Sequence, residues 1–160
     1  MSKLKSKANA LKKISNGVSM TDKEIESILD EAIAYCASLT PSGTRGGAKT
    51  PIDTFWERTE NGYRVVQQGE SVMYLEYGTG TKGEESPHDM YETEWVYNIG
   101  THIFTTKDGR KGWFFPDTPT TWKFTQGQKA NMQMYKTAIF LSERLHTEII
   151  RKRKWAKSQW

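Results

Sequence analysis

The side chains of this sequence that could carry acid–base or metal chemistry are three histidines and one cysteine. His88, His102 and His146 fall in a predicted loop, strand and helix, and no zinc-type spacing joins them. His88 beside Asp89 could act as an acid–base pair or as part of a metal site, but we interpret the two as a solvated loop pair. Cys36 lies on the apolar stripe of a predicted helix, which indicates a small core residue rather than a nucleophile.

Two glycine-containing segments match nucleotide-binding motifs by letter but not by context. Residues 43–50 resemble a phosphate loop, but Ala48 replaces its second glycine and Pro51 stands where a helix should begin. Residues 78–83 have the glycine spacing of a dinucleotide fingerprint, but the acidic pair Glu84–Glu85 follows and would repel a pyrophosphate. We therefore expect no catalytic set, no metal and no cofactor, and we predict that the protein is not an enzyme.

The last ten residues could instead bind a charged macromolecule. Residues 151–160 interleave five cations with Trp155 and Trp160, a composition that can hold nucleic acid by neutralising phosphates and stacking on bases. The alternatives are a polar helix end, or a tail that docks on an acidic neighbour. That neighbour could be the Glu84–Glu94 run of an identical subunit in a ring.

The charge of the 160-residue chain is divided unevenly along it. The formal net charge is +4, yet residues 1–13 hold five lysines and no acid, and residues 144–160 hold six basic residues against Glu148. Residues 14–143 hold 12 basic and 18 acidic residues, so the body is acidic and the positive charge lies at the two ends. Such asymmetry favours pairing with a charged partner, although two solvated chain ends would give the same division.

The elements that would position these residues begin with a helix over residues 21–39. A Thr21–Glu24 capping box opens it, apolar residues follow at helical spacing, and Pro41 ends it. Residues 4–14 could form a short lysine-rich helix before it, and residues 41–51 are predicted as a loop because they have little that can pack. Neither the N-terminal residues, which lack an apolar stretch, nor any 18-residue window predicts a secretory signal or a membrane-spanning helix.

Two β-hairpins are predicted from turn signals, Asn61-Gly62 and Asp108-Gly109, between runs of β-forming residues. The runs are residues 55–59 and 63–67 for the first hairpin, and 102–106 and 112–115 for the second. In the last run Trp113 and Phe115 alternate with Phe114, so one face of that strand should be core and the other exposed or at an interface.

The remaining segments complete an α+β prediction. They are an extended or short helical stretch at 72–77, an acidic loop at 81–94, a short strand at 95–98, a turn around Pro116 and Pro119, and a final helix from about Met132 to roughly Lys154. The order predicts an antiparallel β-sheet of about four to five strands with the N-terminal helix and the long C-terminal helix packed on one face. We expect a basic N-terminal arm over 1–18, one domain over 19–150, and a basic, tryptophan-containing C-terminal tail over 151–160.

Four motifs, taken in order, resemble those of one protein family. The first reads Tyr74-Leu75-Glu76-Tyr77-Gly78-Thr79-Gly80, an aromatic-E-aromatic-G-T-G stretch, with Ser86-Pro87-His88 after it. The others are Gly112-Trp113-Phe114-Phe115-Pro116, Thr125-Gln126-Gly127-Gln128-Lys129-Ala130, and Met134-Tyr135-Lys136-Thr137-Ala138 at the start of the final helix. Their order and spacing over about residues 20–150 are similar to the gene-product-ten-like neck and tail-component family of long-tailed bacteriophages.

The resemblance implies a structural, non-enzymatic virion protein, made in the bacterial host cytoplasm, that acts in head–tail joining and tail completion. Its partners would be copies of itself in a ring, head connector or head-completion proteins, and tail tube or tail terminator proteins, with contact to DNA in the channel as a further expectation and no membrane. The alternative is a small nucleic-acid-binding protein that uses its basic C-terminal tail. The residues that we expect at interfaces are Tyr77, Gly78, Thr79, Gly80, Glu84, Glu85, Trp113, Arg151, Arg153 and Trp155.

Overall fold

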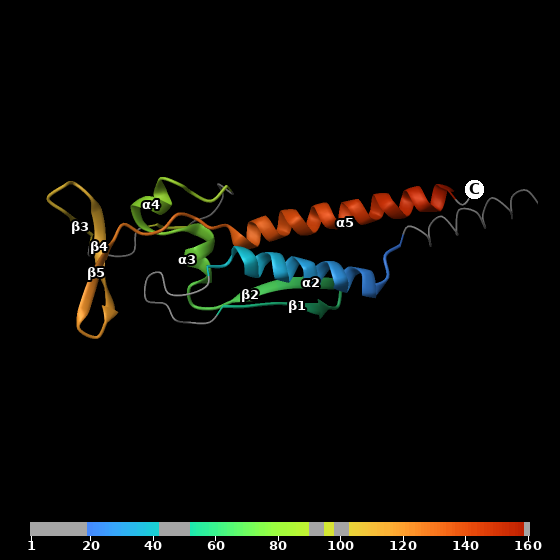
Figure 1. Ribbon diagram of the computed structural model, residues 1–160, viewed down its shortest axis with the longest axis horizontal. Coiled ribbons are helices and arrows are strands. Elements are labelled where there is room, and N and C mark those ends of the chain that lie inside the picture. The colour runs from blue at the N-terminus through green and yellow to red at the C-terminus, as the bar shows by residue number, and fades with distance from the viewer. Residues whose placement is uncertain (1–18, 42–51, 90–94, 98–102, 159–160) are drawn as a thin grey trace, which may run out of the picture. The chain divides into compact units, whose positions relative to one another are not determined.

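The computed structural model describes residues 19–41, 52–89, 95–97 and 103–158, which form four helices and five strands (Figure 1). The short helix predicted over 4–14 lies outside the described residues, as do residues 42–51 of the loop predicted over 41–51 and residues 90–94 of the acidic run. The described residues divide into two compact units: the helical unit, which consists of residues 19–32 and 138–158, and a second unit, which consists of the described residues between 33 and 137 and contains the sheets. Helices α2 (Asp22–Leu39) and α5 (Gln133–Ser158) each contribute to both units.

The helical unit begins with the capping box that the sequence predicts. The backbone N–H of Thr21 donates to Glu24 Oε2 at 2.8 Å, and the N–H of Glu24 donates to Thr21 Oγ1 at 3.3 Å. This reciprocal pair satisfies two of the amides that a helix start leaves without partners. Three residues of the predicted apolar stripe are buried in this part of α2: Ile28, Leu29 and Ala32.

Ion pairs hold α2 and α5 together within this unit, where the two helices run antiparallel (Figure 1). Arg144 donates from Nε and Nη2 to the carboxylate of Glu31 at 2.7 and 2.9 Å, and Lys152 Nζ contacts Glu24 Oε2 at 2.6 Å. The Lys152 ammonium, with help from Thr21, lowers the pKa of Glu24 from 4.5 to about 2. The guanidinium of Arg144 likewise holds the pKa of Glu31 below its ordinary value.

The other unit contains the first predicted hairpin. Strands β1 (Asp53–Thr59) and β2 (Gly62–Gln68) pair antiparallel, with Thr59 opposite Gly62 and Trp56 opposite Val65. The turn therefore consists of Glu60 and Asn61 alone. Asn61 does not adopt a positive φ, so the turn differs from the Asn-Gly geometry that the sequence predicts.

The connection from this hairpin to the next is helical. α3 (Val72–Tyr77) ends at Gly78, and α4 (Gly80–Glu84) begins two residues later, so the predicted loop at 81–94 opens with a helical turn. The strand predicted at 95–98 is absent from its described residues, 95–97. Instead of pairing with a strand, this segment bonds to the start of α4: the carbonyl of Tyr97 accepts the N–H of Gly80 at 2.8 Å.

Three strands form the second sheet, in the order β3 (Phe104–Thr105), β4 (Lys111–Thr118) and β5 (Thr121–Thr125). The β3–β4 hairpin confirms the Asp-Gly prediction. The turn predicted around Pro116 and Pro119 is shorter than expected. β4 continues through a register shift to Thr118, and β5 begins at Thr121 after Pro119 and Thr120. The sequence reading missed β5, although Trp122 and Phe124 alternate as strand residues do.

The α+β class is confirmed, but the strands form two sheets of two and three strands rather than one. Each hairpin pairs locally, and the helical segment 72–84 between them prevents a continuous ladder. The final helix is longer than predicted: α5 runs to Ser158, so residues 151–158 are not a separate tail. On its predicted apolar stripe, Ala138, Ile139 and Ile150 are exposed.

The interior of the unit that contains the sheets is unusually polar. Gln133 and Cys36 are fully buried, and the side chain of Gln133 donates to Gln67 Oε1 at 3.1 Å. Gln67 in turn donates to Thr40 Oγ1 at 3.0 Å, and Asn131 donates to Gln133 Oε1 at 3.0 Å. This chain of amides connects α2, β2 and the first turn of α5. Each buried polar group is therefore satisfied in only one relative arrangement of these elements.

Candidate functional site: a junction of the motif segments

The centre of the candidate site is Glu76, a buried carboxylate on α3 that is only 6% exposed. Its Oε2 accepts the backbone N–H of Met134 at 2.8 Å, and its Oε1 accepts the N–H of Tyr135 at 2.9 Å. These amides belong to the first turn of α5, where the helix dipole also favours negative charge. The residue before α5 is Met132, which has no side-chain oxygen, so Glu76 supplies the cap from another helix.

The end of α3 and the start of α5 stabilise each other. The carbonyl of Leu75 accepts the N–H of Asn131 at 2.7 Å, and the carbonyl of Glu76 accepts the N–H of Met132 at 3.2 Å. Met132 has a φ of 57°, the one positive value at a non-glycine residue in the described part of the chain. These two backbone bonds hold that unfavourable conformation in place.

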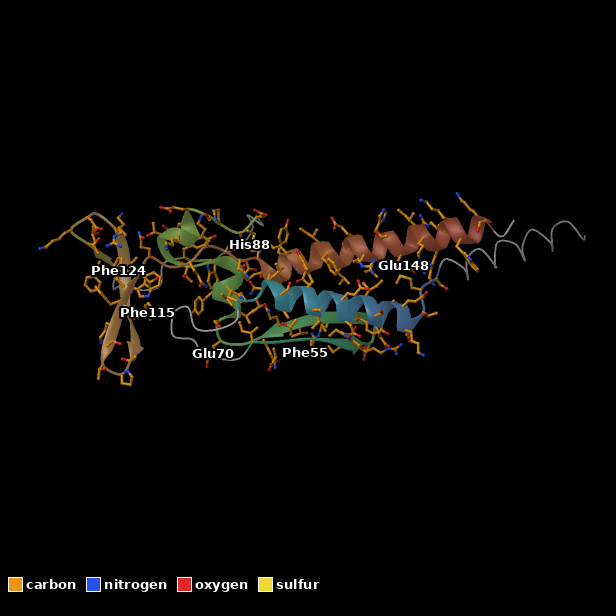
Figure 2. All side chains as sticks on the ribbon, in the orientation of Figure 1. Phe55, Glu70, His88, Phe115, Phe124 and Glu148 are labelled. Carbon is orange, nitrogen blue, oxygen red and sulfur yellow. The ribbon has the colours of Figure 1, made fainter. Side chains whose placement is uncertain are left out.

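His88 completes this buried cluster. Its Nε2 lies 3.1 Å from Glu76 Oε1, and the residue is only 5% exposed, beside the start of α5 (Figure 2). The ring centroid is 4.9 Å from that of Tyr77 and 5.1 Å from that of Tyr135. Trp95 stacks on Tyr77 at 5.3 Å. The interpretation of His88 and Asp89 as a solvated pair is therefore wrong for His88, whereas Asp89 is exposed.

The geometry of Glu76 and His88 is that of a structural cluster rather than an open acid–base pair. Both carboxylate oxygens already accept helix amides, and both side chains are buried. A proton-transfer group must reach a substrate, and this carboxylate instead fixes the direction of α5. Among the described residues, no group of three or more His, Cys, Asp or Glu side chains could hold a metal ion.

The glycine motif after α3 crosses the segment that leads into α5. The N–H of Thr79 donates to the carbonyl of Gln128 at 2.8 Å, and the N–H of Gln128 donates back to the carbonyl of Thr79 at 3.0 Å. Gly78 has a φ of +80°, and a Cβ there would lie 2.6 Å from the backbone nitrogen of Ala130. Only glycine fits both the conformation and the space. The two backbones therefore approach as closely as strands of a sheet do.

The β3–β4–β5 sheet joins the same junction through one of its faces. The indole of Trp113 lies against Gly80, where an added Cβ would be 2.6 Å from Trp113 Cζ3. The N–H of Lys82 also donates to the carbonyl of Gln126 at 3.3 Å. The face of β4 that carries Trp113 and Phe115 is therefore turned toward α4, which answers the question that the alternating sequence left open.

The opposite face of this sheet is an exposed aromatic surface. Phe114 pairs with Phe124, and because side chains alternate along a strand, both lie on the face opposite Trp113 and Phe115. Figure 2 labels Phe124 on this face and Phe115 on the other. Phe114 is 50% exposed and Trp122 is 64% exposed, while the rings of Phe114 and Phe124 are 5.4 Å apart. The members of this aromatic face are Phe104, Phe114, Pro116, Trp122 and Phe124.

The structure separates the residues expected at interfaces into two groups. Gly78, Thr79 and Gly80 are buried, and Tyr77 and Trp113 are half-buried, so these five make contacts within the junction. Glu84, Glu85, Arg151, Arg153 and Trp155 are exposed.

Not every cation near the C-terminus is available to a partner. Arg151 contacts Glu148 on the same helix, with 2.5 Å between Nη2 and Oε1, and Lys152 contacts Glu24. In the described part of the chain, Arg153, Lys154 and Lys157 make no ion pair. The basic surface that the sequence predicted is thus narrower than its composition suggests, and it lies on an ordered helix.

Sequence reasoning did not single out Glu76, Gln67 or Gln133 as key residues. One signal was present for Glu76: it lies four residues after Val72, so both fall on the buried side of α3. A carboxylate on a buried helical position requires strong donors, and helix N-termini supply them. The partners of Gln67 and Gln133 come from distant segments, which no local pattern reveals.

Comparison with known proteins finds no matching family model, no matching curated protein and no matching solved structure. None of the helices in the described ranges combines the length and the apolar character needed to cross a membrane.

Proposed function

We propose that this protein is a structural subunit of the head–tail junction of a long-tailed bacteriophage. It would act without catalysis, as a ring-forming component that docks between the head connector and the tail. One observation carries the proposal. The motifs behind the family resemblance are distant in sequence, yet they meet in a single junction through Glu76, Thr79, Gln128 and Trp113. Residues that hold one fold together are what a shared structural family would retain.

The aromatic face is the surface best suited to docking on a connector or tail protein. Large exposed aromatic rings in contact with one another are uncommon on the surface of an isolated protein and typical of the centre of protein interfaces. Arg110 lies 5.6 Å from the ring centroid of Phe124 and is paired with Asp108, so the face has little net charge. A neutral aromatic surface favours a protein partner over phosphate groups.

Contacts in the junction order the sheet that carries this surface. Trp113 packs against Gly80, and the N–H of Lys82 donates to Gln126, so the sheet is held from its other face. A docking surface of aromatic rings binds more tightly when its side chains and backbone are already ordered, because less conformational entropy is lost.

The proposal is tested by blocking synthesis of the protein during phage growth. We expect DNA-filled heads and complete tails that do not join, and we expect joined particles when the wild-type chain is supplied from a plasmid. Supplying the double variant Phe114→Ser, Trp122→Ser should not restore joining, whereas Lys123→Ser on the other face should. Joined infectious particles in the absence of the protein, or a block before heads form, would contradict the proposal.

Nucleic-acid binding is the second candidate, favoured by one observation. Arg153, Lys154 and Lys157 lie without ion pairs in the described chain next to Trp155, which is 58% exposed. Cations beside an exposed indole can bind single-stranded nucleic acid. This candidate predicts binding to a single-stranded oligonucleotide whose affinity falls steeply with salt and disappears when the three cations are replaced by glutamine.

A further inference from the structure

Two exposed surfaces of opposite charge remain unpaired within the described chain. The first, the basic helix end, consists of Arg153, Lys154, Trp155 and Lys157 on α5. The second, the acidic segment, consists of Glu84, Glu85 and Asp89 at the end of α4 and just after it. All of these side chains are exposed, and none of the charged ones forms an ion pair with another described residue.

These cations differ from three other cations on α5, which already have carboxylate partners in the chain. Arg144 pairs with Glu31, Arg151 pairs with Glu148, and Lys152 pairs with Glu24. Carboxylates of α2 and α5 thus pair with three cations of α5, the last of which is Lys152. Beyond that residue the positive charge is in excess.

We propose that the basic helix end of one copy binds the acidic segment of a second copy of this chain. Three cations face three carboxylates, so the two surfaces are complementary in number as well as in sign. The exposed Trp155 lies on the same turn of α5 but points away from Arg153 and Lys157, because residues two apart on a helix do not share a face.

The contact must be head-to-tail. The basic helix end is positive, and the acidic segment stays net negative even with the exposed Lys82 beside it, so two identical surfaces brought together across a two-fold axis would repel. Every copy carries one surface of each kind, so a heterologous contact between them repeats from copy to copy and gives a ring where the rotation between copies closes. This contact would join neighbouring subunits in the ring of the proposed function. The inference rests on the proposed function only for its biological setting. The contact itself is a property of the purified chain.

A nucleic acid is a less complementary occupant of the basic helix end. A phosphate backbone can pair with the basic helix end alone, whereas a second copy supplies carboxylates to the basic helix end and cations to the acidic segment and so neutralises both. Single exposed ion pairs are weak, at about 0.2–1 kcal/mol each, so three pairs together change affinity by about 3- to 150-fold. The association should therefore weaken as salt rises.

The test uses two neutralised variants of the full chain and their mixture. One carries Arg153→Gln, Lys154→Gln and Lys157→Gln, and the other carries Glu84→Gln, Glu85→Gln and Asp89→Asn. Light scattering after gel filtration should give an oligomer for the wild type and a monomer for each variant. A 1:1 mixture should give a heterodimer and nothing larger, because each variant retains only one of the two surfaces.

The matched control replaces three exposed lysines elsewhere, Lys23, Lys107 and Lys111, with glutamine and should keep the wild-type mass. Circular dichroism of each variant, equal to that of the wild type, verifies that loss of assembly is not loss of folding. A monomeric wild type, variants that assemble as the wild type does, or a mixture that yields no heterodimer would overturn the inference. So would loss of binding to a single-stranded oligonucleotide in the first variant with its oligomeric mass unchanged. None of these outcomes would touch the proposed role in head–tail joining, which the particle phenotype tests separately.

Discussion

Replacing Glu76 with glutamine tests whether a buried carboxylate on α3 holds the first turn of α5. Glutamine has nearly the same shape, but it presents an NH2 group where one carboxylate oxygen now accepts an amide. One of the two bonds, to Met134 at 2.8 Å or to Tyr135 at 2.9 Å, must therefore be lost. The other becomes a neutral hydrogen bond. Both bonds can be kept only by a side chain with two acceptor oxygens, as a carboxylate has, or by a rotation of the backbone.

The expected cost follows from these contacts. A hydrogen bond to a charged group contributes about 1.5–3 kcal/mol, and a buried donor left without a partner costs about 1–3 kcal/mol. Loss of an ordinary N-cap costs about 0.5–2 kcal/mol. Taken together, we expect Glu76→Gln to lower the free energy of unfolding by about 3 kcal/mol, which for a chain of this size lowers Tm by about 6–12 °C.

Urea titration followed by circular dichroism measures this change. Glu57→Gln is the control, because Glu57 forms an exposed ion pair with Arg64 on the β1–β2 hairpin and should cost less than about 1 kcal/mol. Hydrogen exchange adds a local measurement: the amides of Met134 and Tyr135 should exchange faster in Glu76→Gln, while those near Ile28 should not. A variant as stable as Glu57→Gln, with unchanged exchange at α5, would refute the reasoning.

Three further predictions concern the rest of the chain. Gly78→Ala should destabilise the protein by about 1–3 kcal/mol more than Gly109→Ala in urea titration, because the two glycines have φ of +80° and +81° but only Gly78 has backbone within 4 Å; equal costs would mean that the close approach is not real. Because folding lowers the pKa of Glu24 to about 2, its stabilising contribution is present above pH 4.5 and is lost as the pH falls from 4.5 to about 2; the stability gap between wild type and Glu24→Gln should close over that interval, and a constant gap would contradict it. Phe114→Ser should leave the Tm within about 1–2 °C of the wild type, since its ring is half exposed, while Trp113→Ser should lower it by several degrees; the reverse order would mean that the two faces of β4 have been exchanged.

The elements with strong local signals were predictable from the sequence. The Thr21–Glu24 capping box and Pro41 bound α2, and the two turn signals located both hairpins. These features depend on residues within a few positions of one another. The α+β class follows from their order.

The division of strands into two sheets could not be predicted, because sheet membership depends on non-local pairing. The stretch from Val72 to Glu84 reads as well for a strand and a loop as for the two short helices that it forms. Strand β5 was hidden for a different reason. Its five residues lie between turn-forming threonines and Gly127, and one alternating pair, Trp122 and Phe124, is a weak signal.

The candidate site shows the same limit. The glycines at 78 and 80 stood out by type, and the sequence predicted a tight backbone turn there within an interface loop, but it gave no partner for that turn. Their burial comes from Gln128 and Trp113, which are more than thirty residues away in the sequence. His88 was misplaced likewise, since its partner Glu76 lies on a helix that the sequence left undecided.

The position of the protein in the phage particle is the measurement that tests the central claim most directly. Antibodies raised against the purified chain and coupled to gold can be imaged by electron microscopy on intact particles and on separated heads and tails. The proposed function predicts label at the junction between head and tail, and at one end of the separated part that retains the protein. Label spread over the capsid or along the tail, or no label on particles at all, would contradict it.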